Sequence, residues 1–470
     1  MKLKLSFLLA FCIFLSCNNS DDASDPISGK VVNAFSGEPV ENAEIVILEN
    51  GPMTLTDANG LFEFTKDQVT NIPETDRITK DGVEGTAIFV SHDDFRPVER
   101  NVDFNKKTTV EVVPRSIPVF KYNRPVQLND GLATGTLDDA GMNKQIIQNM
   151  MDNILDGDLK EIHSVLVYRN DVLVLEEYFF GNNDTIQFEN NVIVDRTPPD
   201  IQWTRKGKHY IASVNKSLTS TVVGIALDKY GLTPDTKISQ YLPQYSSYFS
   251  DPDKADISFA DCLTMTAGLQ WDEWGSNDLA LMWKTDDIVD FLLKRNSLGV
   301  GAEWRYCSAL PNTLLKAVDN MVDGSARDWA MDNLYGKLGI TDLIWQSQPD
   351  GYPEGAARMY IRPRDMLKIG VTYLNDGVWN GTQVIPRAWV DACFDVKEAT
   401  EFGDYSYFFW LRHLDGVDYL SADGDGGNYI NIIPSLDMVI VVTQGNYLLW
   451  PFYVDQVDEM MQNYIFPSVN

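Results

Sequence analysis

Residues 209–220 read His209-Tyr210-Ile211-Ala212-Ser213-Val214-Asn215-Lys216-Ser217-Leu218-Thr219-Ser220. Apolar residues recur at helical spacing from here onward, which predicts a helix that begins near Ser213 and continues to about Tyr230. The residues on its apolar face are Leu218, Val222, Ile225 and Ala226. Positions i and i+3 are neighbours on a helix, so the side chains of Ser213 and Lys216 can meet within the first turn.

This serine–lysine pair has a chemical interpretation. A serine hydroxyl is a poor nucleophile that needs an adjacent base, and a lysine can supply one where burial leaves its amine neutral. The N-terminal end of a helix also favours negative charge that develops on an oxygen there, in this case the Oγ of Ser213. A capping serine beside a solvated lysine would show the same S-x-x-K pattern, so the interpretation depends on the surrounding sequence.

The surrounding sequence resembles a known family. Residues 212–217, followed by an apolar helix, are similar to the active-site helix of serine β-lactamases and penicillin-binding proteins. The likeness is greatest to the class C-like branch, which includes esterases, D-amino-acid peptidases and aminohexanoate-dimer hydrolases, and it runs from about residue 162 to residue 466. Further matching segments, in the family's order, are Leu263-Thr264-Met265-Thr266-Ala267-Gly268-Leu269, Trp304-Arg305-Tyr306-Cys307-Ser308, 362–370, 377–381, 386–390 and Gly424-Asp425-Gly426-Gly427-Asn428.

The resemblance implies a role for each matched residue. Ser213 would be the nucleophile that accepts the acyl group. Lys216 would take the proton of the Ser213 hydroxyl, or it would hold Tyr306 as a phenolate that takes this proton, and both alternatives stay open. Ser308 occupies the last position of the family's Y-x-N element, so it would orient the substrate carbonyl or the lysine.

The glycine-rich segment near residue 425 is expected to complete the site. The resemblance implies an oxyanion hole made by the backbone N–H groups of Ser213 and Gly427, with Gly426 and Gly427 allowing close approach of the substrate. A flexible hairpin turn is the structural alternative for these glycines. The sequence departs from the family at Gly424, where penicillin-recognising members have a cation for the substrate carboxylate. Without that cation, ester or amide cleavage is expected rather than β-lactam hydrolysis or transpeptidation.

The rest of the chain divides into segments of different pattern. Strand patterns at both ends of a helical middle predict an α+β body over residues 141–470, with a β-lactamase-like antiparallel sheet flanked by helices. Short alternating strands and turns over residues 27–115 predict a small antiparallel β-sandwich. Its strand and turn order resembles a carboxypeptidase regulatory-like domain. Residues 116–140, which are rich in turn formers, predict a linker.

The first residues have the composition of a targeting segment. Residues 1–16 combine a basic start, a short apolar run and a small residue, which predicts a secretory signal. Cys17 directly after this run resembles the lipidated cysteine of bacterial lipoproteins, and an ordinary signal with an incidental cysteine is the alternative. Residues 17–26 would form a polar tether. We therefore expect a lipid-anchored protein of the bacterial cell envelope, outer-membrane, periplasmic or surface-exposed.

The composition argues against several other classes of protein. Lys and Arg number 38 and Asp and Glu 68, so the formal net charge is −30 and nucleic-acid binding is not expected. Neither G-x-S-x-G nor H-E-x-x-H occurs, so a Ser–His–Asp hydrolase and a zinc hydrolase are not supported. For His209 a packed position is favoured over a catalytic one. The cysteines of the body, which are expected to be buried and free, are Cys262, Cys307 and Cys393.

These patterns together predict a serine hydrolase that forms an acyl-enzyme on Ser213. It would cleave an ester or amide bond in a small-molecule or peptide substrate, and it would need neither a metal nor a cofactor. Two alternatives stay open. One is an inactive β-lactamase-like module that binds peptidoglycan or a glycan, and the other is a β-lactamase or D-Ala-D-Ala peptidase proper. The joint presence of Ser213, Lys216 and Tyr306 favours an active enzyme over the binding module.

Overall fold

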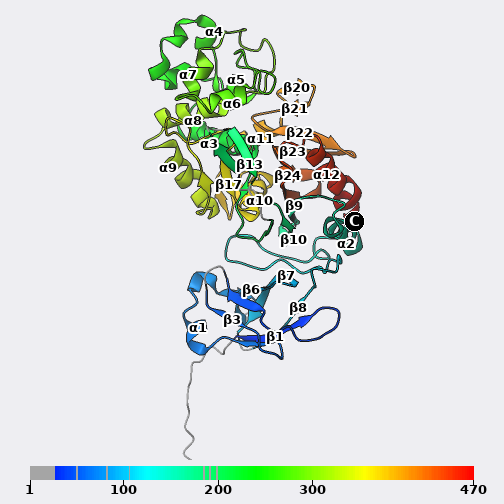
Figure 1. Ribbon diagram of the computed structural model, residues 1–470. Helices are drawn as coiled ribbons and strands as arrows, with labels where there is room; N and C mark the ends of the chain where they lie inside the picture. The colour runs from blue at the N-terminus through cyan, green and yellow to red at the C-terminus, as the bar shows by residue number, and fades with distance from the viewer. Residues whose placement is uncertain are drawn as a thin grey trace, which may run out of the picture. The chain divides into compact units, whose positions relative to one another are not determined.

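The computed structural model describes residues 27–48, 51–80, 83–104, 106–183, 186–189, 192–196 and 200–469. The chain divides into two compact units (Figure 1). The first comprises residues up to His92 together with Asn101–Val112, and the second comprises Asp93–Arg100 and Val113–Asn470. The expected signal, tether and lipidated Cys17 lie outside the described residues. Within those residues, no helix is both long and apolar enough to cross a membrane.

The first unit consists mainly of short strands in two sheets. One sheet has the order β4 (Leu61–Glu63), β1 (Ser28–Asn33), β8 (Lys107–Val112), and the other has the order β3 (Met53–Leu55), β2 (Glu44–Ile47), β6 (Val83–His92), β5 (Ile78–Lys80). Strand β7 (Phe95–Asp103), whose residues are divided between the two units, pairs with β6, and a short helix α1 (Lys66–Thr70) follows β4. The expectation of a wholly antiparallel arrangement is wrong, because β1 and β8 run parallel. A parallel pair needs a long connection, which the residues between these two strands provide.

The second unit contains an eight-stranded antiparallel sheet, which confirms the expected α+β body. Strands β9 (Ile162–Arg169) and β10 (Val172–Tyr178) form an antiparallel hairpin near the start of the body. The order across the sheet is β10-β9-β25-β24-β23-β22-β21-β20, so β9 pairs with the last strand of the chain. The C-terminal strands are β20 (Glu398–Thr400), β21 (Gly403–Tyr405), β22 (Trp410–Leu414), β23 (Val417–Gly424), β24 (Asn428–Ile433) and β25 (Met438–Gln444).

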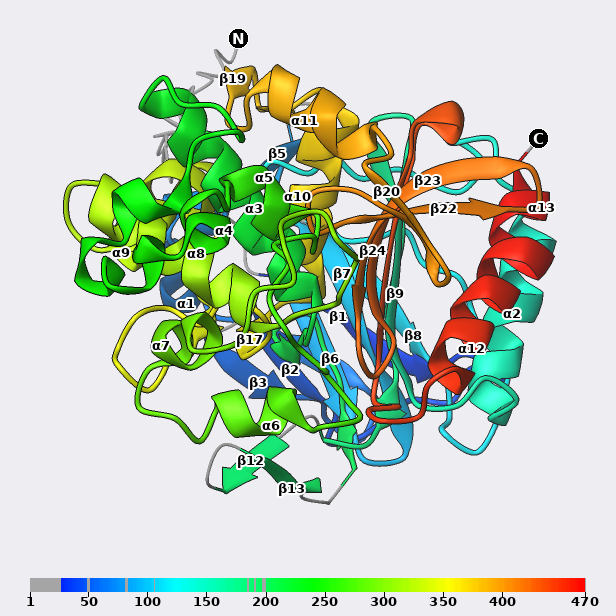
Figure 2. The ribbon, with the colours of Figure 1, turned by 90° about the horizontal axis from the view of Figure 1, so that it is seen from above.

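Both faces of this sheet are covered by helices. Successive strand residues point to opposite faces, and in β25 Val439 and Val441 join one apolar core whereas Ile440 and Val442 join another. Figure 2 shows α2, α12 and α13 on one side of the sheet and α10, α3 and α8 on the other. The helices of this unit are α2 (Lys144–Asp156), α3 (Val214–Lys229), α4 (Pro252–Ala255), α5 (Phe259–Leu263), α6 (Asp278–Met282), α7 (Ile288–Leu293), α8 (Ala309–Met321), α9 (Ala326–Ala330), α10 (Pro363–Leu374), α11 (Arg387–Phe394), α12 (Phe452–Met460) and α13 (Phe466–Ser468).

Short strands connect the helices of the second unit. They form small sheets of two or three strands. These strands are β11 (Phe180–Gly181) with β14 (Ile201–Gln202), β12 (Ile186–Glu189) with β13 (Val192–Arg196), β18 (Val378–Trp379) with β19 (Thr382–Gln383), and β17 (Met359–Ile361) between β15 (His209–Tyr210) and β16 (Ile344–Trp345). The pairing of β15 with β17 matters for the site, because β15 ends just before Ser213.

Residues 116–140 have few regular elements, as expected of a linker, but they pack on the second unit. Leu132 belongs to the core on the α3 side of the sheet, whereas Phe120 and Leu137 belong to the core on the α2 side. The hydroxyl of Tyr122 donates to the backbone oxygen of Val174 in β10 at 2.8 Å. These contacts make the segment a part of the body rather than a spacer.

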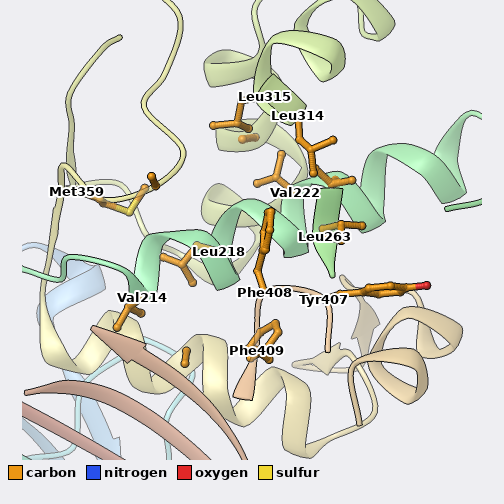
Figure 3. Close-up of a cluster of buried hydrophobic side chains, with 14 of the residues drawn as sticks. Val214, Leu218, Val222, Leu263, Leu314, Leu315, Met359, Tyr407, Phe408 and Phe409 are labelled. Carbon is orange, nitrogen blue, oxygen red and sulfur yellow. The ribbon is translucent and has the colours of Figure 1, made fainter. Parts of the chain in front are cut away.

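The predicted helix after Ser213 is present as α3, and it is buried on all sides. Residues Val214 to Leu227 are all buried, including the polar ones. Figure 3 shows Val214, Leu218 and Val222 along α3, with Leu263, Leu314 and Phe408 around the helix. The buried hydroxyls find backbone partners, since Ser217 donates to Phe408 O at 2.6 Å and Thr219 to Gly355 O at 2.8 Å. A helix that is buried all round is held rigidly, and so is its first turn.

Candidate active site

Ser213, the residue just before α3, follows a residue with an unusual backbone conformation. The residue before it, Ala212, has a φ of 45°, in the left-handed region that residues other than glycine rarely adopt. Ser213 is the N-cap residue of α3, but its side chain accepts no capping hydrogen bond. Its hydroxyl is therefore not occupied in holding the helix together.

Lys216 lies on the first turn of α3 and is only 2% exposed. Its Nζ donates to the Oγ of Ser213 at 2.9 Å and to the backbone oxygen of Ala356 at 3.0 Å. The loop around Ala356 is held by the buried Glu354 carboxylate, which accepts the backbone N–H groups of Ala356 at 3.1 Å and Ala357 at 2.6 Å. The expected contact between Ser213 and Lys216 is thus present, and a second buried loop orients the amine.

The ring of Tyr306 lies beside the amine of Lys216. The Nζ of Lys216 lies 4.9 Å from the ring centroid of Tyr306. Trp274 stacks on this ring with centroids 5.7 Å apart and planes at 13°, and Trp410 does so at 6.4 Å and 14°. No hydrogen bond joins the Tyr306 hydroxyl to Ser213 or Lys216 in the described part of the chain. The aromatic stack therefore fixes the ring plane, while Lys216 contacts Ser213 directly.

Ser308 binds a carboxylate that the sequence analysis did not single out. Glu273 is 4% exposed, and its Oε2 accepts the Ser308 backbone N–H at 3.1 Å and the Trp271 indole N–H at 2.6 Å. The Ser308 hydroxyl donates to Oε1 of Glu273. Burial raises the pKa of Glu273, and the positive charge of Lys216 is the main effect that opposes this rise.

The glycine-rich turn between β23 and β24 packs on the segment before Ser213. A Cβ added at Gly424 would lie 2.3 Å from the backbone oxygen of Ile211, so only glycine fits there. Gly426 and Gly427 have φ of 86° and 93°, which favour glycine. The Gly427 N–H donates to Gly424 O at 3.2 Å within the turn. Gly424 therefore contacts the segment just before Ser213. The oxyanion role of Gly427 stays a prediction.

His209 is buried and packed, in agreement with the position favoured from the sequence. It is fully buried, and its ring stacks on Trp203 with centroids 3.9 Å apart. Its Nε2 lies 3.4 Å from the Thr443 hydroxyl. Burial lowers the pKa of His209 to about 3.

The cysteines and acidic residues show no metal-binding arrangement in the part of the chain that is described. Cys262, Cys307 and Cys393 are buried free thiols, as their odd number predicts. Among the described residues, no group of three or more His, Cys, Asp or Glu side chains could hold a metal ion. The expectation of a reaction without metal or cofactor stays a prediction.

Two residues of the site were missed from the sequence. Glu273 lies in the segment Trp271-Asp272-Glu273-Trp274, where a carboxylate between two large aromatics is a weak signal of burial. Trp274 is 66% exposed and covers one face of Tyr306. No local spacing relates this segment to Ser213, because the contact depends on how the loop before α6 and the loop after α7 return to α3.

The fold and the site together define a class of protein. A hydroxyl held against a buried amine, before a helix that packs on an antiparallel sheet, is the arrangement of a serine hydrolase. The chain belongs to the beta-lactamase family, whose sequence profile, described as Beta-lactamase, matches residues 148–452, more than half of its length. In its family and in the fold of its second unit it is a β-lactamase-like protein.

Individual relatives agree with this assignment. The 6-aminohexanoate-dimer hydrolase of Paenarthrobacter ureafaciens is 24% identical over 261 residues, which cover 50% of this chain and 65% of that protein, just under two thirds. A Bacillus anthracis structure assigned as a 6-aminohexanoate-dimer hydrolase has a TM-score of 0.54 at 16% identity, and the match covers 75% of this chain and 88% of the other. A family VIII carboxylesterase has a TM-score of 0.53 at 14% identity, with 67% and 95% covered. These two structural matches show a shared fold.

Proposed function

We propose that this protein cleaves an ester or amide bond through an acyl-enzyme on Ser213. The observation that carries the proposal is the 2.9 Å hydrogen bond between the Ser213 Oγ and the buried Nζ of Lys216. A nucleophile within hydrogen-bond reach of a base, which a further group orients, is the arrangement that covalent catalysis requires. The further group is the Ala356 carbonyl, which holds the amine of Lys216.

In the proposed reaction, the Oγ of Ser213 attacks the carbonyl carbon of the substrate and its proton passes to the Nζ of Lys216. The backbone N–H groups of Ser213 and Gly427 stabilise the negative charge that develops on the carbonyl oxygen. Lys216 gives the proton to the leaving alcohol or amine as the bond to the acyl carbon breaks. Water then cleaves the acyl-enzyme by the same steps, which releases an acid and restores Ser213.

Tyr306 is the alternative base in this scheme. The direct bond of Lys216 to the Ser213 hydroxyl supports the lysine, because a general base must reach the proton that it removes. The ring of Tyr306 lies against Lys216, between Trp274 and Trp410. This position supports a part for Tyr306 in shaping the site.

The substrate that we propose is an ester or a linear amide rather than a β-lactam. Gly424 stands where penicillin-recognising members of the family have a cation, and its contact with Ile211 leaves no space for a side chain. The similarity to a 6-aminohexanoate-dimer hydrolase and the fold shared with a carboxylesterase support linear amides and esters as substrates. A β-lactamase or D-Ala-D-Ala peptidase remains the alternative.

Labelling with a fluorophosphonate probe tests the nucleophile. Wild-type protein should be labelled covalently and Ser213→Ala should not, because the probe forms a bond to the serine oxygen. Ser217→Ala is a matched control, since this hydroxyl lies on the same helix but donates to Phe408 O, and it should keep the label. Absence of label on the folded wild-type protein would refute the hydrolase proposal and favour the inactive module that binds peptidoglycan or a glycan.

A substrate panel tests the chemical class. Purified protein should hydrolyse p-nitrophenyl esters or D-amino-acid amides faster than the β-lactam nitrocefin. The reverse order would overturn the argument from Gly424 and identify a β-lactamase proper.

We further propose that Cys17 carries a lipid and that the first unit, a carboxypeptidase regulatory-like domain, separates the enzyme from the membrane. The support is the sequence resemblance of both segments and the small β-sheets of the first unit. Membrane fractionation of cells that express the full chain tests the anchor. Wild-type protein should sediment with the membrane and Cys17→Ala should not, and equal distribution of the two would contradict the proposal.

A further inference from the structure

Glu273 is a buried carboxylate that the reaction described above leaves without a role. Its two oxygens accept the Ser308 backbone N–H, the Trp271 indole N–H and the Ser308 hydroxyl. Backbone and indole N–H groups can only donate, so this set of partners suits an ionised carboxylate. A buried ionised group is stable only where an opposite charge lies near it.

The groups that face Glu273 identify this opposite charge. Trp274, the neighbour of Glu273, stacks on the ring of Tyr306, and the Nζ of Lys216 on α3 lies 4.9 Å from the centroid of the same ring. Lys216 is thus the cation of this cluster, and its charge lowers the pKa of the Glu273 carboxyl. Cys307 and Tyr405 also face Glu273, but burial raises the pKa of both well above the usual range, so both are neutral near pH 7. Arg305 on the neighbouring loop forms its ion pair with another carboxylate. Lys216, once it has taken up a proton, is therefore the positive group that Glu273 balances.

We propose that Glu273 is a positioning residue of this enzyme, which serves as the counter-charge of Lys216 and holds Ser308 beside it. The inference rests on the function proposed above. When the Ser213 proton passes to Lys216, an ammonium forms in a buried site, where an unbalanced charge is costly. The ionised Glu273 stabilises this ammonium through the low-dielectric interior. The proton later leaves with the leaving group, so Glu273 remains ionised throughout.

The variant Glu273→Gln tests this role because it keeps the side-chain shape and removes the charge. The rate constant for labelling by a fluorophosphonate should be measured as a function of pH. The labelling rate should rise with pH as the base loses its proton. Without the nearby negative charge, that rise should move to lower pH by about 1 unit. The maximal rate should fall about tenfold or more, since the ammonium is no longer balanced.

Two further variants separate this role from a structural one. Asp272→Asn removes a neighbouring charge that binds the backbone N–H groups of Gly275 and Ser276, and it should leave the pH profile unchanged. Glu273→Asp keeps the charge, so its labelling rate should rise at the same pH as that of the wild type, even if the maximal labelling rate falls. It also keeps the proposal testable if Glu273→Gln fails to fold.

The possible failures can be told apart. The wild-type protein could be labelled while Glu273→Gln gives lower rates that rise at the same pH as those of the wild type. This result would overturn the counter-charge role and leave the hydrolase proposal intact. A Glu273→Asp profile that is shifted like the Gln profile would also overturn it. An unlabelled wild-type protein would refute the hydrolase proposal instead.

Discussion

Lys216 has one partner that its own helix supplies and two that distant segments supply. The contact with Ser213 follows from a spacing of three residues, so it could be predicted from the sequence. The Ala356 carbonyl and the Tyr306 ring could not, because both belong to loops that reach α3 only in the folded chain. The position of the Lys216 amine therefore depends both on a neighbour along the chain and on loops that are distant in sequence.

Loss of this amine should stop the reaction. Lys216→Ala removes the group that accepts the Ser213 proton, and kcat/KM for a p-nitrophenyl ester should fall about a thousandfold. Lys229→Ala, at the far end of the same helix, removes an exposed amine that pairs with Asn333 and should change little. Wild-type turnover in Lys216→Ala, with folding confirmed by circular dichroism, would refute the proposed base.

The buried His209 should make stability depend on pH. Its pKa is about 3 in the folded protein and about 6.5 in the unfolded chain. Between these values only the unfolded chain binds the proton, so the stabilisation is complete above pH 6.5 and is lost as the pH falls toward 3. In His209→Phe, the dependence of unfolding free energy on pH should be weaker by up to about 1.4 kcal/mol per pH unit. Denaturant titrations measure this free energy at each pH. The same pH dependence in the wild type and in His209→Phe would contradict the prediction.

Among the helices and strands, regular periodicity was easier to predict than the turns that interrupt it. The hairpin β9–β10, the helix α3 and the proline at the start of α10 all follow from local patterns. The strand pattern over residues 405–411 does not form one continuous strand, because the chain turns between β21 and β22. Phe408 has a φ of 59° there and donates its N–H to Leu263 O, a long-range contact that no local pattern encodes.

The turn after β23 offers a test of how one element supports another. In Gly424→Ala, the new Cβ would clash with the Ile211 oxygen, so the turn or the segment before Ser213 must move. The unfolding free energy should fall by about 1 to 3 kcal/mol and ester hydrolysis should fall at least about tenfold.

Gly416→Ala is the matched control for this change. Gly416 lies in the hairpin turn between β22 and β23, has a φ of 80° and has open space around it. Its substitution should cost about 1 kcal/mol of stability through backbone strain and leave activity unchanged. Full activity in Gly424→Ala would show that the turn does not position the site.

Across the chain, two units have separate apolar cores. Val31 in β1 is fully buried in the first unit, and Val441 in β25 is fully buried in the second. Val31→Ala should cost about 2 kcal/mol and speed amide exchange in β1 and β8, but not in α3. Val441→Ala should speed exchange in β9 and β24 instead. Hydrogen exchange with mass spectrometry measures both, and faster exchange in α3 of Val31→Ala would contradict independent cores.

Local sequence was sufficient for the features that depend on neighbours along the chain. The Ser213–Lys216 pair, the helix that carries it and the alternating strands belong to this group, since helix and strand periodicities are short-range. The hydrogen bond of Ser308 to Glu273 and the stacking of Trp274 and Trp410 on Tyr306 were decided by the tertiary structure alone. These contacts join loops and strands far apart in sequence, and they exist only because packing on the sheet and on α3 brings those segments together.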